Sequence, residues 1–347
     1  MELLFRDALQ SLIDRKDFTY EQMLAVMRQV MSGELTPVQI AGLLVGLRMK
    51  GETVDEIAAA AEVMRELSSK VSVKDGAHLI DTCGTGGDGI QTFNVSTVCA
   101  FVAAAAGARV AKHGGRSVSS TCGSADVLEA LGVNVNLTPA QVAKCVDEIG
   151  IGFMFAPNHH SAMKYAAPVR RELGVRTLFN LLGPLTNPAG AKRQVMGVFH
   201  RDLTSLLAGV LQRLDSEHVL VVHGADGMDE ISFAGDTYVA ELKDGQVREY
   251  VLNPQQFGLP LHDVQSIRVQ NAEQSKQLLL AVLSGETGPA RDIVLLNAGA
   301  AIYVAGLVAN LAAGIACASR MIDSGEAKNK LQQMIVLSRQ MSQGTSD

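Results

Sequence analysis

The sequence contains no tryptophan, and aromatic residues make up only 4% of its 347 residues. It also lacks an excess of positive charge, because 36 Asp and Glu residues outnumber 30 Lys and Arg residues and give a formal net charge of −6. Nucleic-acid binding usually requires a basic face and aromatic side chains on which bases stack. The composition therefore argues against a nucleic-acid partner.

Cysteine is also scarce. The five cysteines are odd in number and include no Cys-x-x-Cys pair, which favours a reducing, cytoplasmic location. Charged residues interrupt the first segment at Glu2, Arg6 and Asp7, so the sequence predicts no secretory signal peptide.

One long segment, residues 293–319, lacks any charge and is long enough to cross a bilayer. Alanine and glycine dominate it, whereas membrane insertion favours Leu, Ile, Phe and Val. We therefore predict closely packed helices in a protein core, with a break near Gly306 or Gly314, and no membrane partner.

The local patterns indicate two kinds of architecture in one globular chain, whose length suits about two domains. Helix starts of the Thr-x-x-Glu/Gln type recur at Thr19, Thr36 and Thr53 and predict helices over the first seventy or so residues. After Asp75, short apolar runs such as Val133–Val135 alternate with helical segments. Such alternation is typical of a mainly parallel sheet.

Four glycines between positions 84 and 89 follow the apolar run His78–Ile80 and precede the helix-like segment Ser96–Ala106. Glycine lets a backbone approach an anion closely, and the free N–H groups of the loop and helix start can point toward it. The spacing matches neither the dinucleotide fingerprint nor the Walker loop. Taken alone, the loop is either a phosphate site or a glycine-rich turn without a ligand.

A second cluster, Lys112–Ser120, follows the strand-like run Arg109–Ala111 and combines two cations, two glycines and three hydroxyls. Within one βαβ unit, both turns would lie at the same sheet edge, where parallel sheets bind ligands. This predicts a polyanion site, although Lys112 and Arg116 also fit a solvated surface pair.

A third cluster follows the strand-like run His218–Val222 and ends in the adjacent carboxylates Asp229 and Glu230. In a loop, both can face Mg²⁺, which takes one or two carboxylates and uses phosphate oxygens as further ligands. The alternative is a pair of solvated loop acids. The three clusters together are the parts needed to bind a Mg²⁺-complexed phosphorylated substrate.

Five segments in this order resemble the anthranilate phosphoribosyltransferases, enzymes of tryptophan biosynthesis. They are residues 84–88, 94–97, 112–124, 180–187 and 229–230. The resemblance extends from the N-terminal helices to residues 293–303, which is essentially the whole chain.

The resemblance implies an α/β fold of the nucleoside phosphorylase/phosphoribosyltransferase type. In it, a small all-helical domain is hinged to a larger α/β domain with a mainly parallel central sheet. The expected helical domain is residues 1–72 with an excursion at about 165–190, and the expected α/β domain is residues 73–164 and 191–342. Family members typically form homodimers through the helical domain.

The implied reaction transfers the phosphoribosyl group of 5-phosphoribosyl 1-diphosphate to the amine of anthranilate and releases pyrophosphate. Because an aryl amine is already neutral, we expect positioning and electrostatics and no side-chain acid or base. The implied cofactor Mg²⁺ would be held by Ser96, Asp229 and Glu230. The implied donor site comprises Gly84, Gly87, Asp88, Thr92, Asn94, Val95, Ser96, Thr97, Lys112, His113, Gly114, Gly115, Arg116, Ser117, Val118, Ser119, Ser120 and Ser124.

The anthranilate site implied by the resemblance comprises Gly84, His113, Tyr165 and Arg170. Arg170 would bind the carboxylate in a bidentate manner, which a lysine cannot reproduce. One departure is Gly115, where the family usually has an Asn that touches anthranilate. Histidines 113, 159 and 160 indicate pocket-lining or structural roles more than a metal site, because no third ligand has suitable spacing.

Two other classes stay open. Some homologues of this fold bind nucleic acid without transferase activity, and a shift assay with single-stranded DNA would identify them. Pyrimidine nucleoside phosphorylases share the architecture but have no use for the Asp229–Glu230 pair, so Mg²⁺ dependence separates them.

Overall fold

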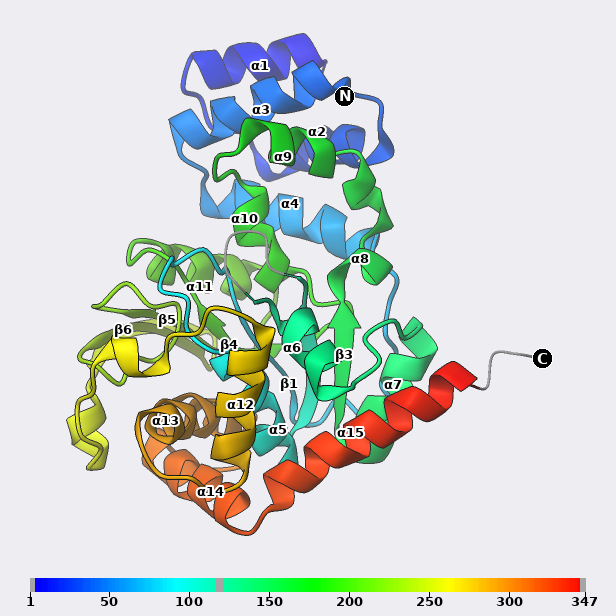
Figure 1. Cartoon of the computed structure of the whole chain (residues 1–347). Helices are drawn as coiled ribbons and strands as arrows, with labels where there is room; N and C mark the ends of the chain where they lie inside the picture. Colours follow the sequence, from blue (N-terminus) through cyan, green and yellow to red (C-terminus); the bar gives the residue numbers. More distant parts are fainter. Residues whose placement is uncertain (1–3, 117–121, 344–347) are drawn as a thin grey trace.

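The computed structural model describes residues 4–116 and 122–343 (Figure 1). Its N-terminal part consists of helices α1 (Phe5–Ile13), α2 (Tyr20–Ser32), α3 (Pro37–Lys50) and α4 (Val54–Glu66). The predicted starts of α2, α3 and α4 are confirmed, because each has both hydrogen bonds of a capping box. Local sequence alone therefore sets where these helices begin.

A later segment of the chain lies against these helices (Figure 1). It comprises the 3-10 helix η1 (Ser161–Lys164), α9 (Ala167–Leu173) and α10 (Phe179–Leu182), followed by η2 (Gly183–Leu185). Helix α9 contacts α3, α10 contacts α4, and η1 contacts α2. The chain thus leaves the α/β part, packs on the helices and returns.

The α/β part contains a seven-stranded sheet in the order β3-β2-β1-β4-β5-β6-β7. Its first five strands in sequence are parallel and the last two antiparallel, so the predicted mainly parallel sheet beside a helical domain is confirmed. The strands are β1 (Leu79–Gly84), β2 (Arg109–Gly114), β3 (Ile151–Phe155), β4 (Arg193–Gly197), β5 (His218–Gly224), β6 (Thr237–Lys243) and β7 (Gln246–Leu252).

Helices cover both faces of the sheet, as parallel sheets require. Helices α5 (Val95–Ala105) and α13 (Pro289–Val304) contact one part of it, and α11 (Leu203–Arg213) contacts β5, β6 and β7. Each face of the sheet has its own apolar core. Leu220 and Val222 of β5 belong to the first core, which contains residues of α5 and α13, whereas Val219 and Val221 belong to the second, which contains residues of α11. Because α11 also packs on α4, the second core continues into the helical bundle.

The remaining helices lie around these cores. They are α6 (Ser124–Leu131), α7 (Pro139–Ile149), α8 (Ala156–His159), η3 (Pro254–Phe257), η4 (Val264–Ile267), α12 (Ala272–Leu283), α14 (Leu311–Asp323) and α15 (Glu326–Gln343).

The uncharged segment forms two packed helices, α13 and α14, and the predicted break is confirmed at Gly306, which has φ +78°. A Cβ atom on Gly314 would lie 2.2 Å from the carbonyl oxygen of Gly299, so the two backbones touch where these glycines meet. In the part of the chain that the structure describes, no helix is long and apolar enough to cross a membrane.

Two details of the sequence interpretation were wrong. Strands β1 and β2 run on to Gly84 and Gly114, beyond their predicted ends at Ile80 and Ala111, because neighbouring strands β4 and β3 supply pairing partners. The buried run 133–135 forms no strand, because its backbone N–H groups bond elsewhere: Val133 to the end of α6 and Asn134 to Ser338 of α15.

Candidate functional site

The predicted glycine loop lies at the point where the strand order reverses. Strand β1 is followed by β2 on one side, whereas β4 and then β5 continue on the other side. The last residues of β1 and β4, Gly84 and Gly197, are partners across the sheet, and the N–H of Thr85 donates to the Gly197 carbonyl at 2.9 Å. Parallel sheets bind ligands at such a reversal, outside the carboxyl ends of the strands.

Two glycines let the Asp229 segment approach this edge. A Cβ atom on Gly197 would lie 1.5 Å from the backbone oxygen of Asp229, and one on Gly84 would lie 2.4 Å from Oδ2 of Asp229. The same Oδ2 accepts a hydrogen bond of 2.9 Å from the N–H of Gly86. Gly197 was missed by the sequence interpretation, although a glycine directly after the apolar run Val195–Met196 is a signal for a close approach at a strand end.

The predicted metal residues meet around the start of α5. The backbone N–H of Ser96 lies close enough to Glu230 to stabilise its charged form, and Asp229 interacts electrostatically with Glu230 and Asp88. Burial and the charge of Asp88 raise the pKa of Asp229, and burial and the charge of Asp229 raise the pKa of Glu230 to about 8. Burial and the repulsion between neighbouring carboxylates thus favour the neutral forms of Asp229 and Glu230.

The cation that the structure places among them is Lys112. Its ammonium group is buried and donates to the Thr82 carbonyl and, at 3.2 Å, to Oγ of Ser96. Among the described residues, no three His, Cys, Asp or Glu side chains form a metal-binding group by themselves. Two carboxylates and a hydroxyl nevertheless fit Mg²⁺, which prefers oxygen ligands and takes the others from water and phosphate.

The other predicted loop residues are held by distant segments. Oδ1 of Asn94 accepts a hydrogen bond of 2.7 Å from Oγ of Ser275 in α12, a residue that the sequence interpretation missed. The backbone of Thr92 pairs with Arg268, and Oδ1 of Asp88 accepts from the N–H of Ile90 at 3.1 Å. Residues Val95 and Thr97 are buried, and Gly87 has φ +78°.

The two cations of the second cluster, Lys112–Ser120, contact different parts of the structure. Arg116 turns to α6 and forms ion pairs with Asp126 at 3.1 Å and Glu129 at 2.6 Å, so it does not join Lys112. Oγ of Ser124 lies 3.5 Å from the Gly115 carbonyl and occupies the space where a Cβ atom on Gly114 would lie. The predicted residues Ser117, Val118, Ser119 and Ser120 lie outside the described residues.

His113 is a buried neutral imidazole. Burial lowers its pKa to about 3, and Nδ1 lies 3.2 Å from the Gly183 carbonyl, which a neutral ring satisfies by donating from Nδ1. Nε2 is then an acceptor, and it has no hydrogen-bond partner among the described residues. The backbone is held as well, because the N–H of His113 donates to Oδ1 of buried Asp81 at 3.1 Å.

Arg170 and Tyr165 come from the segment that packs on the helical part. Burial lowers the pKa of Arg170, whose guanidinium carbon lies 5.3 Å from the ring centre of Phe179. Within residues 4–116 and 122–343, no carboxylate forms an ion pair with it. The Tyr165 ring instead fills the space beside Gly33 at the end of α2 and is 37% exposed.

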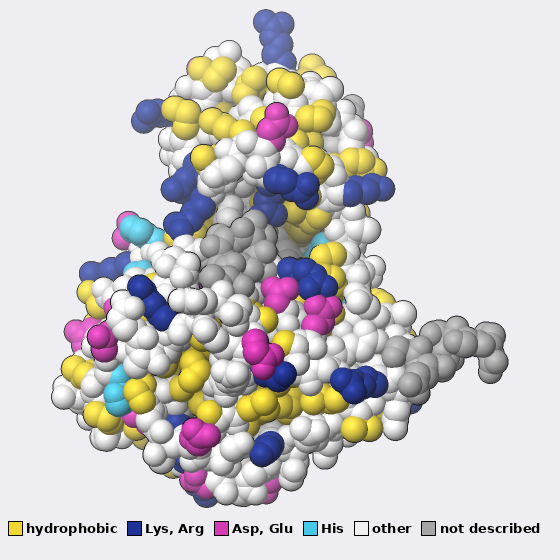
Figure 2. Space-filling view, in the orientation of Figure 1, with side chains coloured by type: hydrophobic (Ala, Val, Ile, Leu, Met, Phe, Trp, Pro, Cys, Tyr) yellow, Lys and Arg dark blue, Asp and Glu magenta, His cyan; other side chains and the backbone are white. Residues whose placement is uncertain are grey.

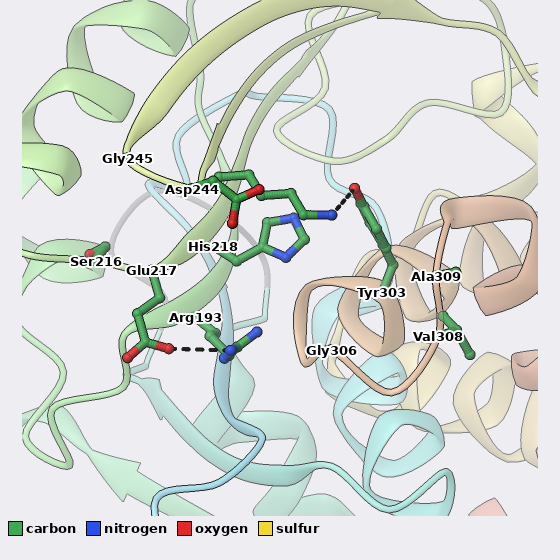
Figure 3. A pocket seen from close by; sticks show the side chains of 11 residues that line it. Arg193, Ser216, Glu217, His218, Asp244, Gly245, Tyr303, Gly306, Val308 and Ala309 are labelled. Carbon is green, nitrogen blue, oxygen red and sulfur yellow. Dashed lines mark hydrogen bonds and ion pairs between the residues drawn. The ribbon is translucent and has the colours of Figure 1, made fainter.

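A cavity of ≈ 540 Å³ lies at the opposite end of the sheet and contains none of the predicted site residues (Figure 3). It is lined by the first residues of β4 and β5, Arg193 and His218, and its polar groups already bond to one another. Arg193 pairs with Glu217 at 3.2 Å, and the ammonium group of Lys243 donates to the Tyr303 hydroxyl at 3.1 Å. The chemistry of the glycine loop is not found there.

Two protein-family models match the chain, one over its N-terminal helices and one over its α/β part. A model described as "Glycosyl transferase family, helical bundle domain" matches residues 6–68, and one described as "Glycosyl transferase family, a/b domain" matches residues 76–328. The anthranilate phosphoribosyltransferase of Methylobacillus flagellatus is 71% identical over 96% of this chain and 97% of its own length. The chain belongs to the anthranilate phosphoribosyltransferase family.

Further relatives and solved structures belong to the same family. The anthranilate phosphoribosyltransferase of Thiobacillus denitrificans is 64% identical over 97% of this chain and 98% of its own length. The crystal structure of the Thermus thermophilus protein has a TM-score of 0.91 and 45% identity, covering 96% of this chain and 99% of that one. The Saccharomyces cerevisiae protein in complex with PRPP and Mg has a TM-score of 0.88 and 26% identity, over 97% and 98% of the two chains.

The close approach at Gly197 generates a prediction. Replacing Gly197 with Ala forces the Asp229 backbone away from the sheet edge, because the new Cβ and the Asp229 oxygen cannot lie 1.5 Å apart. We expect kcat/KM to fall by about 100-fold or more in steady-state assays, since small misplacements of binding groups are costly. Gly235→Ala is the matched control, because its Cβ meets no atom within 4 Å. Wild-type activity in Gly197→Ala would contradict this role.

Proposed function

We propose that the protein transfers the phosphoribosyl group of 5-phosphoribosyl 1-diphosphate to the amine of anthranilate, giving N-(5-phosphoribosyl)anthranilate and pyrophosphate. The observation that carries the proposal is the meeting of Ser96, Lys112, Asp229 and Glu230 beside the glycine loop at the strand reversal. The family membership and the yeast relative's complex with PRPP and Mg support it.

The donor would occupy the sheet edge beyond β1 and β4. Positive φ angles at Gly86, Gly87 and Gly89 give the loop a left-handed backbone that glycine adopts readily, and α5 begins at the same edge. We propose that Gly84, Gly87, Asp88, Thr92 and residues 94–97 bind the diphosphate and ribose, together with residues 112–120 and Ser124. For Arg116, this role would require its ion pairs with Asp126 and Glu129 to break.

Mg²⁺ would be held by Ser96, Asp229 and Glu230. Bound there, it supplies positive charge that stabilises the leaving pyrophosphate. Burial and the charges of neighbouring carboxylates raise the pKa values of Asp229 and Glu230, and a cation bound there would offset both effects. The buried ammonium group of Lys112 holds Ser96 in position through a hydrogen bond to its Oγ atom.

Anthranilate, which would accept the phosphoribosyl group, has to be oriented but needs no strong base. Nε2 of His113 can accept a hydrogen bond from the anthranilate amine, but with a pKa of about 3 it cannot retain a proton. Arg170, which has no carboxylate partner among the described residues, is suited to the anthranilate carboxylate. We propose Gly84 and Tyr165 as further contacts of this substrate.

We also propose that the protein is a cytoplasmic homodimer that pairs through the helical domain, residues 1–72 with the excursion at about 165–190. Helix α3 exposes Val38 (82%), Val45 (37%) and Met49 (72%), which recur at helical spacing, and neighbouring α1 exposes Ile13 (66%). Apolar side chains are visible over this part of the surface (Figure 2). Several exposed apolar side chains on neighbouring helices are typical of a protein interface.

The activity is tested by mixing the protein with Mg²⁺, 5-phosphoribosyl 1-diphosphate and anthranilate. We expect anthranilate fluorescence to disappear as an equal amount of pyrophosphate is released. Replacing Asp229 and Glu230 together with Ala should lower kcat/KM by about 100-fold or more while circular dichroism stays unchanged, because the metal-assisted stabilisation is lost. Folded wild-type protein without turnover would overturn the assignment. Undiminished Mg²⁺ dependence in the double variant would move the metal site elsewhere.

The acceptor site is tested at Arg170. Arg170→Lys keeps the charge but loses the planar guanidinium group that can bind both carboxylate oxygens. We therefore expect KM for anthranilate to rise by about tenfold or more, which corresponds to about 1.4 kcal/mol of binding free energy. The KM for the phosphoribosyl donor should change little. Gly115→Asn restores the family's usual amide and should lower the anthranilate KM or leave it unchanged. A normal anthranilate KM with a lowered melting temperature would assign Arg170 a structural role.

The dimer is tested by charging its apolar face. Val38→Asp combined with Met49→Asp should convert the dimer to a monomer in analytical ultracentrifugation, because two buried carboxylates per subunit would lose their hydration. Val336→Asp on α15 is the control, since Val336 is 53% exposed and α15 lies at the opposite end of the molecule from α3 (Figure 1). A wild-type protein that sediments as a monomer would refute the proposal.

A further inference from the structure

Arg176 joins the helical side of the molecule to the glycine loop. Its guanidinium group donates a hydrogen bond to the carbonyl oxygen of Gly87, and its central carbon lies 4.1 Å from the ring centre of Phe199. Phe199 is itself attached to the loop, because its N–H donates to Oγ1 of Thr85 at 3.2 Å. One arginine thus contacts the glycine loop and the residue that anchors the loop to the end of β4.

The backbone beside Arg176 is held by the helical part. Thr177 and Leu178 are buried, and Leu178 belongs to the apolar core formed with the N-terminal helices. The N–H of Thr177 donates to Oδ1 of Asn180 at 3.0 Å, and the N–H of Asn180 donates to the Thr177 carbonyl at 2.9 Å. The side chain that extends from this anchored turn can therefore position the loop relative to the helical domain.

The charge around the loop gives Arg176 a second role. Asp88, Asp229 and Glu230 are acidic, and Lys112 lies beneath them, bonded to Thr82 and Ser96. Arg116 is already paired with the carboxylates of α6. The undescribed residues 117–121 are Ser, Val, Ser, Ser and Thr, so they add no cation.

Arg176 differs from Lys112, which is buried, in being exposed, and it differs from Arg116 in its lack of a carboxylate partner among the described residues. Among the described residues, no carboxylate lies within ion-pair distance of it, and a guanidinium has five N–H donors, of which the Gly87 contact uses one. A planar guanidinium group that lies over an aromatic ring is suited to bind two phosphate oxygens at once.

We propose that Arg176 binds the diphosphate of the phosphoribosyl donor and holds the glycine loop through Gly87. This inference rests on the proposed function, because it assigns a further ligand to the same donor. Phe199 acts as a positioning residue, since its ring supports the guanidinium group and its backbone is tied to the loop.

The test uses the full-length protein and two readouts. Arg176→Gln should raise KM for 5-phosphoribosyl 1-diphosphate by about tenfold or more and leave KM for anthranilate within about twofold. Calorimetry with inorganic pyrophosphate and Mg²⁺ should show a Kd raised by a similar factor. Arg176→Lys should recover part of the loss, because the charge remains without the planar guanidinium group. Phe199→Leu should weaken pyrophosphate binding less than Arg176→Gln does.

The control is Arg171→Gln, which removes the same charge from an exposed position on α9 and should leave both constants unchanged. An unchanged donor KM and pyrophosphate Kd in Arg176→Gln would overturn the inference, as would equal losses in Arg171→Gln. A lowered melting temperature with both KM values raised equally would also overturn it. If wild-type protein binds pyrophosphate in an Arg176-dependent manner without turning over anthranilate, the inference stands and the proposed function fails.

Discussion

The contact between the ends of β1 and β4 and the Asp229 segment is the constraint on which the candidate site depends. Gly84 and Gly197 are paired across the sheet, and neither position has room for a side chain beside Asp229. This contact places the two adjacent carboxylates at the strand reversal, next to the start of α5. Without it, the glycine loop and the acidic loop would be separate features of the surface.

A second constraint connects the site to the position of the helical domain. Buried Asp81 accepts hydrogen bonds from the backbone of His113 and, at 2.7 Å, from Nδ2 of Asn187. The same returning segment supplies the Gly183 carbonyl to His113 and the Leu185 carbonyl to Arg65 of α4. Residues 183–187 thereby link α4, the sheet and the imidazole ring of His113.

The shared core gives this linkage its physical basis. Helix α11 packs on the sheet and on α4, so the apolar core of the helical part continues under β4 and β5. A shift of the helices relative to the sheet would disturb packing that is close to crystalline in density, and such interiors transmit strain. The residues proposed to bind anthranilate and those proposed to bind the phosphoribosyl donor are therefore held in one framework.

Features that depend on neighbouring residues follow from the amino-acid sequence alone. The capping boxes at Thr19, Thr36 and Thr53 specify helix starts within four residues, and the break at Gly306 follows from a glycine between two apolar helices. The alternation of apolar runs and helices predicted the mainly parallel sheet. Clusters of glycines and carboxylates also marked two loops that meet at the strand reversal, and the cation cluster marked Lys112 in the neighbouring strand β2.

Which of these residues meet depends on the tertiary structure. Lys112 turns inward to Ser96, whereas Arg116 turns outward to Glu129, and no local pattern distinguishes the two cations. The roles of Gly197, Ser275 and Arg176 depend on contacts with residues that are 32, 181 and 89 positions away, as for Asp229, Asn94 and Gly87 respectively. Such contacts arise from the packing of whole elements, which single-sequence patterns do not encode.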